Sequence, residues 1–177
     1  MTELVAPPTE SFMSQVHIRP LTEADLPALE WDGEFTHFRR VYANAYKRMK
    51  KGLALLWVAA LPGAGLIGQT FVQLSCDRPE LADGRSRAYI YSFRVRQPYR
   101  RAGLGAHMMD VVESDLRQRG LAWVTLNVAK DNQGALELYQ RLGYKIAAHE
   151  AGRWSYPDHK GIWQQVIEPA WRMVKRL

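Results

Sequence analysis

The sequence predicts an α/β domain on three observations. An apolar strand over 88–95 leads through a basic turn into an amphipathic helix. A short apolar strand over 123–128 is followed by a helix over 135–142. Two more apolar runs, 53–61 and 66–74, flank a loop with proline and glycine that is typical of a tight hairpin. Strands and helices therefore alternate beside an antiparallel pair.

The N-terminal part predicts one strand and two helices after a loose arm. Residues 1–15, with a Pro-Pro pair and scattered polar residues, are expected to form a flexible arm. The run 16–26 predicts the first strand and the start of a helix. A turn at 31–34 precedes a second helix over 35–51. Its apolar side consists of Phe38, Tyr42, Ala45 and Met49.

The middle of the chain predicts two helices packed on a sheet. Alternation in the strand over 88–95 places four side chains on one face, those of Tyr89, Tyr91, Phe93 and Val95. The next helix ends at Gly120 and carries an apolar stripe made of Leu104, Met108, Val111, Val112 and Leu116. Asn132 can cap the helix that follows.

The C-terminal part predicts an extended hairpin and a final strand. Residues 154–156 and 162–166 flank a turn at 157–161, and an apolar run closes the chain at 171–177. Three tryptophans in this part either pack internally or form a contact between subunits. A homodimer through the hairpin is therefore one of two interpretations of this segment.

The turn at 100–105 has the features of a pyrophosphate site. A helix N-terminus leaves several backbone N–H groups without partners, and the helix dipole adds partial positive charge. Gly103 and Gly105 lack a Cβ, so an anion can approach the backbone closely. A dinucleotide fingerprint needs a third glycine where this chain has Met108, and no Gly-Lys-Ser/Thr triplet is present. Four arginines are expected to cluster at this turn: Arg94, Arg96, Arg100 and Arg101.

Composition and charge bound the function further. The length of 177 residues predicts a single domain over 16–177 after the arm, and one cysteine, Cys76, predicts no disulfide framework. No apolar run approaches the roughly 20 residues of a membrane span, and we expect a cytoplasmic protein. The net charge of +6 invites a nucleic-acid partner, yet no nucleic-acid-binding signature accompanies it. We therefore expect no nucleic acid, no membrane and no metal as partners.

Motifs from 93 to 144 carry a resemblance to a known family. An Arg-x-x-Gly-x-Gly pattern after a strand is followed by Asn132-Gln-Gly-Ala135, by Tyr139 and by Gly143-Tyr144. This arrangement resembles the GNAT superfamily of acetyl-CoA-dependent N-acetyltransferases. The resemblance implies a GNAT-like acyl-CoA N-acyltransferase fold, with a mixed, mostly antiparallel sheet flanked by helices and splayed between its fourth and fifth strands. It also implies acetyl-CoA as co-substrate.

The resemblance further implies which residues hold the cofactor. The backbone of the fourth strand would pair with the pantetheine arm, and the glycine turn would bind the pyrophosphate. The later helix would add an asparagine and a tyrosine, Tyr139, that acts as general acid. The implied cofactor-binding set is Phe93, Arg94, Val95, Arg100, Arg101, Ala102, Gly103, Leu104, Gly105, Ala106, Asn132, Ala135 and Tyr139.

The general base is unassigned, because the chain departs from a common pattern of the family. Many members carry a carboxylate on the fourth strand, where this chain has Tyr91 and Ser92. An amine with a pKa of about 10.4 must lose a proton before it attacks a thioester. The resemblance places Asp32 and Glu34 beside the acceptor. Glu34, or water near Ser92, is therefore the candidate for deprotonation.

The expected function is transfer of an acetyl group from acetyl-CoA to a primary amine of a small molecule by direct attack. Acetylation of a protein, at its N-terminus or at a lysine, is an alternative within the same fold. A non-catalytic acyl-CoA-binding sensor is an alternative of another class. The missing strand carboxylate favours the sensor, whereas Tyr139 and Asn132 argue for an enzyme.

Overall fold

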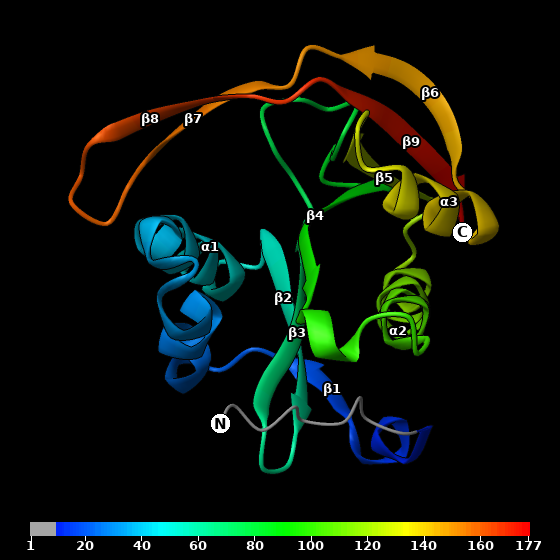
Figure 1. Ribbon diagram of the computed structural model, residues 1–177. Helices are drawn as coiled ribbons and strands as arrows, with labels where there is room; N and C mark the ends of the chain where they lie inside the picture. Colours follow the sequence, from blue (N-terminus) through cyan, green and yellow to red (C-terminus); the bar gives the residue numbers. More distant parts are fainter. Residues whose placement is uncertain (1–9) are drawn as a thin grey trace.

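A seven-stranded mixed sheet forms the centre of the computed structural model, which describes residues 10–177 (Figure 1). The strand order is β1-β2-β3-β4-β5-β9-β6, in which β4 and β5 run parallel and the other neighbours antiparallel. The mixed, mostly antiparallel sheet is therefore confirmed. Its strands are β1 (His17–Pro20), β2 (Ala54–Leu61), β3 (Gly65–Gln73), β4 (Arg87–Val95), β5 (Trp123–Ala129), β6 (Lys145–Glu150) and β9 (Ala170–Arg176).

Helices cover both faces of this sheet (Figure 1). One face carries α1 (Arg39–Lys50) with two 3-10 segments, η2 (Glu23–Gly33) and η3 (Thr36–Phe38). The other face carries α2 (Leu104–Gln118) and α3 (Gln133–Arg141). Between β4 and α2 the chain forms one more short 3-10 turn, η4 (Gln97–Tyr99).

Two apolar layers hold the helices on the sheet. The layer under α2 contains fully buried side chains of β4, β5 and α2, namely Ile90, Leu126, Met109, Val112 and Leu116. The layer under α1 contains Leu29, Tyr42, Ala45, Leu56 and Phe71. Side chains of β4 pack into both layers, so this strand lies between two close-packed apolar layers.

Strand β6 is an element that the sequence pattern does not predict. Its residues are mostly exposed, and its Ala-Ala pair has low strand propensity. The strand forms because β9 offers a free edge, along which Lys145 pairs with Val174 and Glu150 pairs with Ala170. Ala170 pairs with Ala129 of β5 on its other side. This pairing brings Glu150 to the end of the sheet where β5 stops.

Strands β7 (Arg153–Pro157) and β8 (Trp163–Ile167) form a separate hairpin that arches over α1 (Figure 1). The extended hairpin predicted here is confirmed. Trp154 and Tyr156 pack against Phe38 of η3, with ring centroids 6.2 Å and 4.9 Å away. In contrast, Trp163 and Ile167 are 67% and 66% exposed. One face of the hairpin therefore packs on the domain, and a homodimer through the other face stays a prediction.

The arm predicted over 1–15 is corrected for its last six residues. Residues 1–9 lie outside the described part of the chain, whereas Glu10–Gln15 form a 3-10 helix, η1. Phe12 is 6% exposed, and its ring meets that of Tyr99 edge-on at 5.4 Å. This apolar contact anchors η1 beside the turn that follows β4.

Residues 10–177 contain no helix that combines the length and the apolarity needed to cross a membrane. In the same part of the chain, no group of three or more His, Cys, Asp or Glu side chains is arranged to hold a metal ion.

Candidate active site

Strands β4 and β5 pair over only the first part of their length. Their parallel register runs from Arg87 with Trp123 to Ile90 with Leu126. Beyond this point β4 continues to residue 95 and still pairs with β3 on its other edge. Among residues 10–177, no strand pairs there with its backbone N–H and C=O groups on the β5 side. The predicted splay between the fourth and fifth strands is therefore confirmed, and we call this opening the gap.

A β-bulge at Ser92 reverses the side-chain alternation beside the gap. The register between β3 and β4 shifts here, and Ser92 adopts a φ of 51°. Tyr89 and Tyr91 stack at 5.8 Å, and Tyr91 packs with the core under α1. Phe93 and Val95 pack with the cores under α2. Placing all four on one face is therefore wrong for Phe93 and Val95, because one extra residue breaks the period of two.

The Ser92 hydroxyl lies at the edge of the gap and is held by two donors. Gln69 donates from Nε2 to Ser92 Oγ at 3.1 Å and to the Ser92 carbonyl at 3.3 Å. Arg94 donates from Nη1 to the same Oγ at 3.2 Å. Since these donors occupy both lone pairs of the oxygen, the hydroxyl proton is left for a group in the gap. Ser92 can therefore donate a hydrogen bond to water or to a substrate.

The turn between β4 and α2 presents backbone amides as an anion site requires. Gly103 has a φ of +91°, and its carbonyl accepts the hydrogen bond of His107 N–H at 3.0 Å. The N–H groups of 104–106 consequently have no partner inside the helix. A Cβ at Gly103 would meet nothing within 4 Å, so the space beside Gly103 itself is open. This geometry suits the predicted role of residues 100–106, which stays a prediction.

Helix α3 brings the other predicted cofactor residues to the α2 side of the gap. Asn132 Oδ1 accepts from the Ala135 N–H at 3.2 Å, which caps the helix, and within the described residues Nδ2 donates no hydrogen bond. Tyr139 is 7% exposed, and its ring centroid lies 6.3 Å from that of Phe93. Burial, and then the nearby Tyr89 hydroxyl, raise the pKa of Tyr139 well above its usual value. Tyr139 therefore stays protonated, as the predicted general acid must be.

Arg94 and Arg96 turn away from the phosphate turn, which corrects the predicted cluster of four arginines. The bulge directs the Arg94 side chain to the α1 side, where Nη1 donates to Tyr42 Oη at 2.9 Å. Arg96 donates from Nε to the Leu66 carbonyl at 2.9 Å and lies over the Trp31 ring at 5.0 Å. Any contact of Arg94 with a cofactor in the gap is therefore left to its backbone.

Asp32 and Glu34 lie at the protein surface. The Asp32 side chain is 93% exposed, and its ion-pair partner is Arg96, with Nη1 3.5 Å from Oδ2. Glu34 is exposed as well. Neither residue lines the large cavity that adjoins the gap. Their role in acceptor binding, and that of Glu34 as base, stay predictions.

A cavity of about 970 Å³ lies on the α1 side of the gap. Ser92 and Asn127 line it at the point where β4 and β5 part. Other walls come from α1, η3 and the β7–β8 hairpin. The aromatic residues that line the cavity, two of them on β4, are Phe38, Tyr42, Tyr89, Tyr91, Trp154 and Tyr156. The size is within the range of small-molecule sites. The gap thus lies between the phosphate turn on one side of the sheet and an aromatic cavity on the other.

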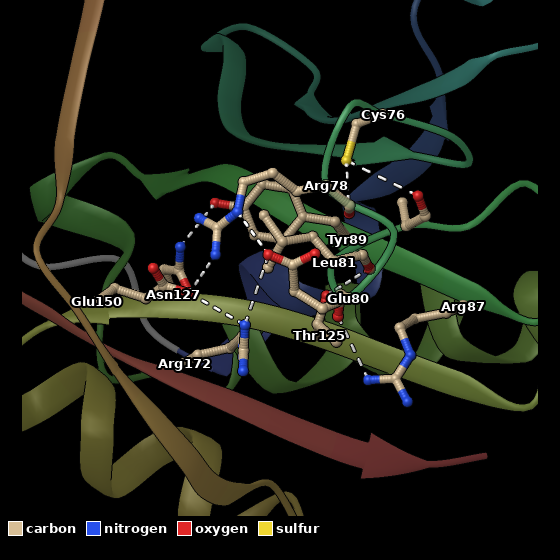
Figure 2. A network of polar contacts seen from close by, with 11 residues as sticks. Cys76, Arg78, Glu80, Leu81, Arg87, Tyr89, Thr125, Asn127, Glu150 and Arg172 are labelled. Atoms are coloured by element: carbon tan, nitrogen blue, oxygen red, sulfur yellow. Dashed lines mark hydrogen bonds and ion pairs between the residues drawn. The ribbon is translucent and has the colours of Figure 1, made fainter.

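A charged network closes the cavity next to β6 (Figure 2). Arg78 donates to Glu150 Oε1 at 2.7 Å and to Glu80 at 2.8 Å. Arg172 of β9 donates to the same oxygen of Glu150 at 3.3 Å. Two guanidinium groups therefore hold the Glu150 carboxylate at the edge of the cavity.

Asn127 and Tyr89 form the polar floor of the cavity (Figure 2). Asn127 donates from Nδ2 to Tyr89 Oη at 3.4 Å, and its Oδ1 is buried without a partner among the described residues. Burial raises the pKa of both Tyr89 and Tyr91 to about 12. Neither phenol can therefore act as a base at neutral pH, whereas Asn127 Oδ1 can accept a hydrogen bond from a substrate.

Three cavity residues escape the sequence-based prediction. Asn127 left a usable signal, because a polar residue interrupts the apolar strand β5 at a position facing away from the α2 core. Arg78 and Glu150 left none. They are 72 positions apart in the chain and meet only because β6 pairs with β9.

Comparison with known proteins agrees with this architecture. Residues 20–144 match the model described as the Acetyltransferase (GNAT) family. This match covers more than half of the chain and defines its class, the GNAT acetyltransferases. The chain belongs to this family, and the resemblance found in the sequence is confirmed.

Individual relatives support the same conclusion. A mycothiol acetyltransferase from Thermobifida fusca is 33% identical over 91 residues, which are 51% of this chain and 28% of that protein. The structure of NAA60 from Arabidopsis thaliana in complex with acetyl-CoA has a TM-score of 0.69 at 18% identity, covering 92% of this chain and 98% of that one. The spermidine/spermine N-acetyltransferase SpeG from Vibrio cholerae has a TM-score of 0.67 at 16% identity, covering 92% and 93%.

These relationships have a limited reach. The two structures show the shared fold alone, because their identities are low. The chain spans between 28% and 54% of the length of three curated relatives that it matches. The activity of this protein is therefore argued from its own residues.

Proposed function

We propose that this protein transfers an acetyl group from acetyl-CoA to the primary amine of a small molecule by direct attack. The gap carries the proposal, because it lies between the free amides of α2 on one side of the sheet and the aromatic cavity on the other. In our proposal, a ligand with an anionic head and a long, thin arm reaches through this opening. When bound, acetyl-CoA supplies an activated acyl group as a thioester.

Residues along the gap divide the binding between them. The N–H groups of 104–106 and the open space at Gly103 suit a pyrophosphate. The edge of β4 at Phe93 and Val95, which no strand pairs with among the described residues, suits the amide groups of the pantetheine arm; the Val95 carbonyl also accepts from Arg100 Nε at 2.7 Å. Asn132 Nδ2 adds a donor from α3.

Direct attack requires three proton movements. The protonated amine first loses one proton. The neutral nitrogen then bonds to the carbonyl carbon and loses a second proton, while the bond from carbon to sulfur breaks and the sulfur gains a proton. In our proposal Tyr139 donates this proton to the sulfur, and its burial and raised pKa, which keep it protonated, support that role. In our proposal, water hydrogen-bonded to Ser92 accepts the protons that the amine loses. Tyr89 and Tyr91 do not take this role, because their raised pKa values keep both phenols protonated at neutral pH.

An assignment of the base to water can be tested against the surface carboxylates. If water near Ser92 is the base, the Asp32→Asn, Glu34→Gln double variant keeps both kcat and the KM for the acceptor, because neither side chain lines the cavity. A lower kcat would instead assign the base to Glu34. A higher KM with unchanged kcat would show that the two carboxylates attract the amine.

The proposed activity is tested by CoA release on panels of amines and peptides, with calorimetry for acetyl-CoA binding. Turnover on small amines, with acetyl-CoA binding that Gly103→Val weakens, is the expected result. Preferred turnover on peptide N-termini or lysines would move the acceptor to proteins. Acetyl-CoA binding without turnover on any acceptor would support a sensor. Cytoplasmic localisation of this enzyme is part of the proposal and is tested by fractionation.

A further inference from the structure

The large cavity carries an excess of positive charge. Its charged lining consists of Arg40, Arg78, Arg94, Arg153, Glu150 and Glu168. Arg78 and Glu150 offset each other at 2.7 Å. Within the described residues the other three arginines are in no ion pair, and Glu168 is the one lining carboxylate left to offset them. The cavity therefore favours anionic groups over cationic ones.

Arg94 is the one of these arginines that lies beside the proposed reaction centre. Its Nη1 is 2.9 Å from Tyr42 Oη and 3.2 Å from Ser92 Oγ. Its guanidinium lies 4.2 Å from the centroid of the Phe35 ring and 5.2 Å from that of Phe38. Two hydrogen bonds and two rings thus fix the orientation of this guanidinium before a ligand arrives.

The fixed orientation leaves one edge of the guanidinium unused. Both hydrogen bonds to the described residues come from Nη1, and none comes from Nε or Nη2. These two nitrogens form the side of the fork that binds the two oxygens of a carboxylate or phosphate in parallel. Arg94 lines the cavity, so an anion there can reach it.

We propose that the acceptor is a small amine that also carries an anionic group, a carboxylate or a phosphate, and that Arg94 binds this group. The inference rests on the proposed acetyl transfer and narrows its substrate class. Since Arg94 Nη1 is 3.2 Å from Ser92 Oγ, the anion and the reacting amine are joined by a short linker, as in an amino acid. The aromatic walls fit an apolar body on the same molecule.

The same charge pattern disfavours polyamines. A second ammonium group would meet three arginines that no described carboxylate pairs with, and Glu168 alone would attract it. Spermidine is therefore a useful counter-example in the test, because SpeG, whose fold this chain shares, is named for that substrate.

The test compares matched acceptors on the full-length protein. The pairs are phenylalanine with phenylalaninamide and O-phosphoethanolamine with ethanolamine, with spermidine and an acidic peptide alongside. We expect kcat/KM to favour the anionic member of at least one pair. Whichever pair shows the preference identifies a carboxylate or a phosphate. Arg94→Gln should reduce kcat/KM for the anionic member roughly 10- to 100-fold more than for the neutral member, and a loss shared by both members measures the contact of Arg94 with Ser92. Arg94→Lys, which keeps the charge without the fork, should fall between.

Arg119→Gln provides the matched control, because Arg119 pairs with Asp115 on the surface of α2 and does not line the cavity. It should preserve the preference for anionic acceptors. Thermal melting of each variant establishes that it is folded. A second measurement does not need turnover: the CoA-loaded protein should bind N-acetylphenylalanine, or acetylated phosphoethanolamine, more tightly than the neutral analogue, and Arg94→Gln should abolish the difference.

Several results would overturn the inference. These are faster acetylation of neutral amines, spermidine or the acidic peptide, an equal loss on both members of a pair in folded Arg94→Gln, or no anion preference in the binding measurement. Fast acetylation of spermidine would leave the proposed acetyl transfer intact while refuting the role of Arg94. Absence of all turnover would refute the proposed function, and the binding measurement would still decide the role of Arg94.

Discussion

Replacing Tyr139 by phenylalanine separates a catalytic hydroxyl from a packing ring. The ring is 7% exposed and packs near Phe93 and Tyr144, with centroids 6.3 Å and 5.9 Å away. Within residues 10–177, its hydroxyl forms no hydrogen bond with another residue. Tyr139→Phe keeps the ring and removes only the oxygen, so we expect folding to be preserved while the proposed acid is lost.

The expected magnitudes follow from these contacts. Loss of a general acid lowers kcat roughly 10²- to 10⁴-fold, which corresponds to about 3–5 kcal/mol in the activation free energy. The free energy of unfolding should change by less than about 1 kcal/mol, because no hydrogen bond inside the protein is broken. The affinity for acetyl-CoA should stay close to that of the wild type. The pKa of Tyr139 is raised above the usual value of about 10. We therefore expect wild-type activity not to fall through ionisation of Tyr139 up to a pH of about 10.

Tyr144→Phe is the matched control, with the opposite expectation. Tyr144 is 2% exposed, and its hydroxyl donates to the buried Glu113 carboxylate at 2.8 Å. A hydrogen bond to a charged group contributes about 1.5–3 kcal/mol, which for a chain of this size lowers Tm by about 3–12 °C. Turnover at a temperature where the variant is folded should be unchanged.

Release of the CoA thiol, followed with a chromogenic disulfide at saturating acetyl-CoA and acceptor, measures kcat for all three proteins. Calorimetry measures the free energy of unfolding and the affinity for acetyl-CoA. Wild-type kcat in a folded Tyr139→Phe protein would refute the reasoning and reduce Tyr139 to packing. An equal loss of kcat in Tyr144→Phe would show that the assay reports stability rather than chemistry.

Three further predictions address other parts of the molecule. Gly103→Val should weaken acetyl-CoA binding at least about 10-fold, whereas Gly63→Val, equally strained at a φ of +81° and equally open, should not; equal effects would reject the phosphate turn. The pKa of Asp25 is lowered to about 2 chiefly by the Arg19 hydrogen bond, so stability present above the unfolded pKa of 3.8 is lost as pH falls through about 2. In the Arg19→Met variant, Tm should fall less steeply between about pH 4 and about pH 2 than in the wild type. The same dependence of Tm on pH in both proteins would contradict this role of Arg19. Trp163→Ser with Ile167→Ser should shift a dimer to monomer in sedimentation, and a monomeric wild type would refute the hairpin contact.

Local signals in the sequence determined the elements that form the proposed cofactor side. The glycines of the turn, the stripe of α2 and the cap of α3 each act within a few residues, and the structure contains all three. The family follows from the same motifs, because their spacing along the chain is what a strand, a phosphate turn and two helices require.

The side of the sheet that we propose for the acceptor was decided by tertiary structure alone. The bulge at Ser92 places the Arg94 side chain on the face of the sheet opposite the phosphate turn. No pattern in the sequence of the strand predicts this bulge. Glu150 reaches the cavity only because β9 folds between β5 and β6. The cavity joins residues from 38 to 170, and its charge depends on which arginines find carboxylate partners. Such pairings depend on distances in space, which the order of residues along the chain does not contain.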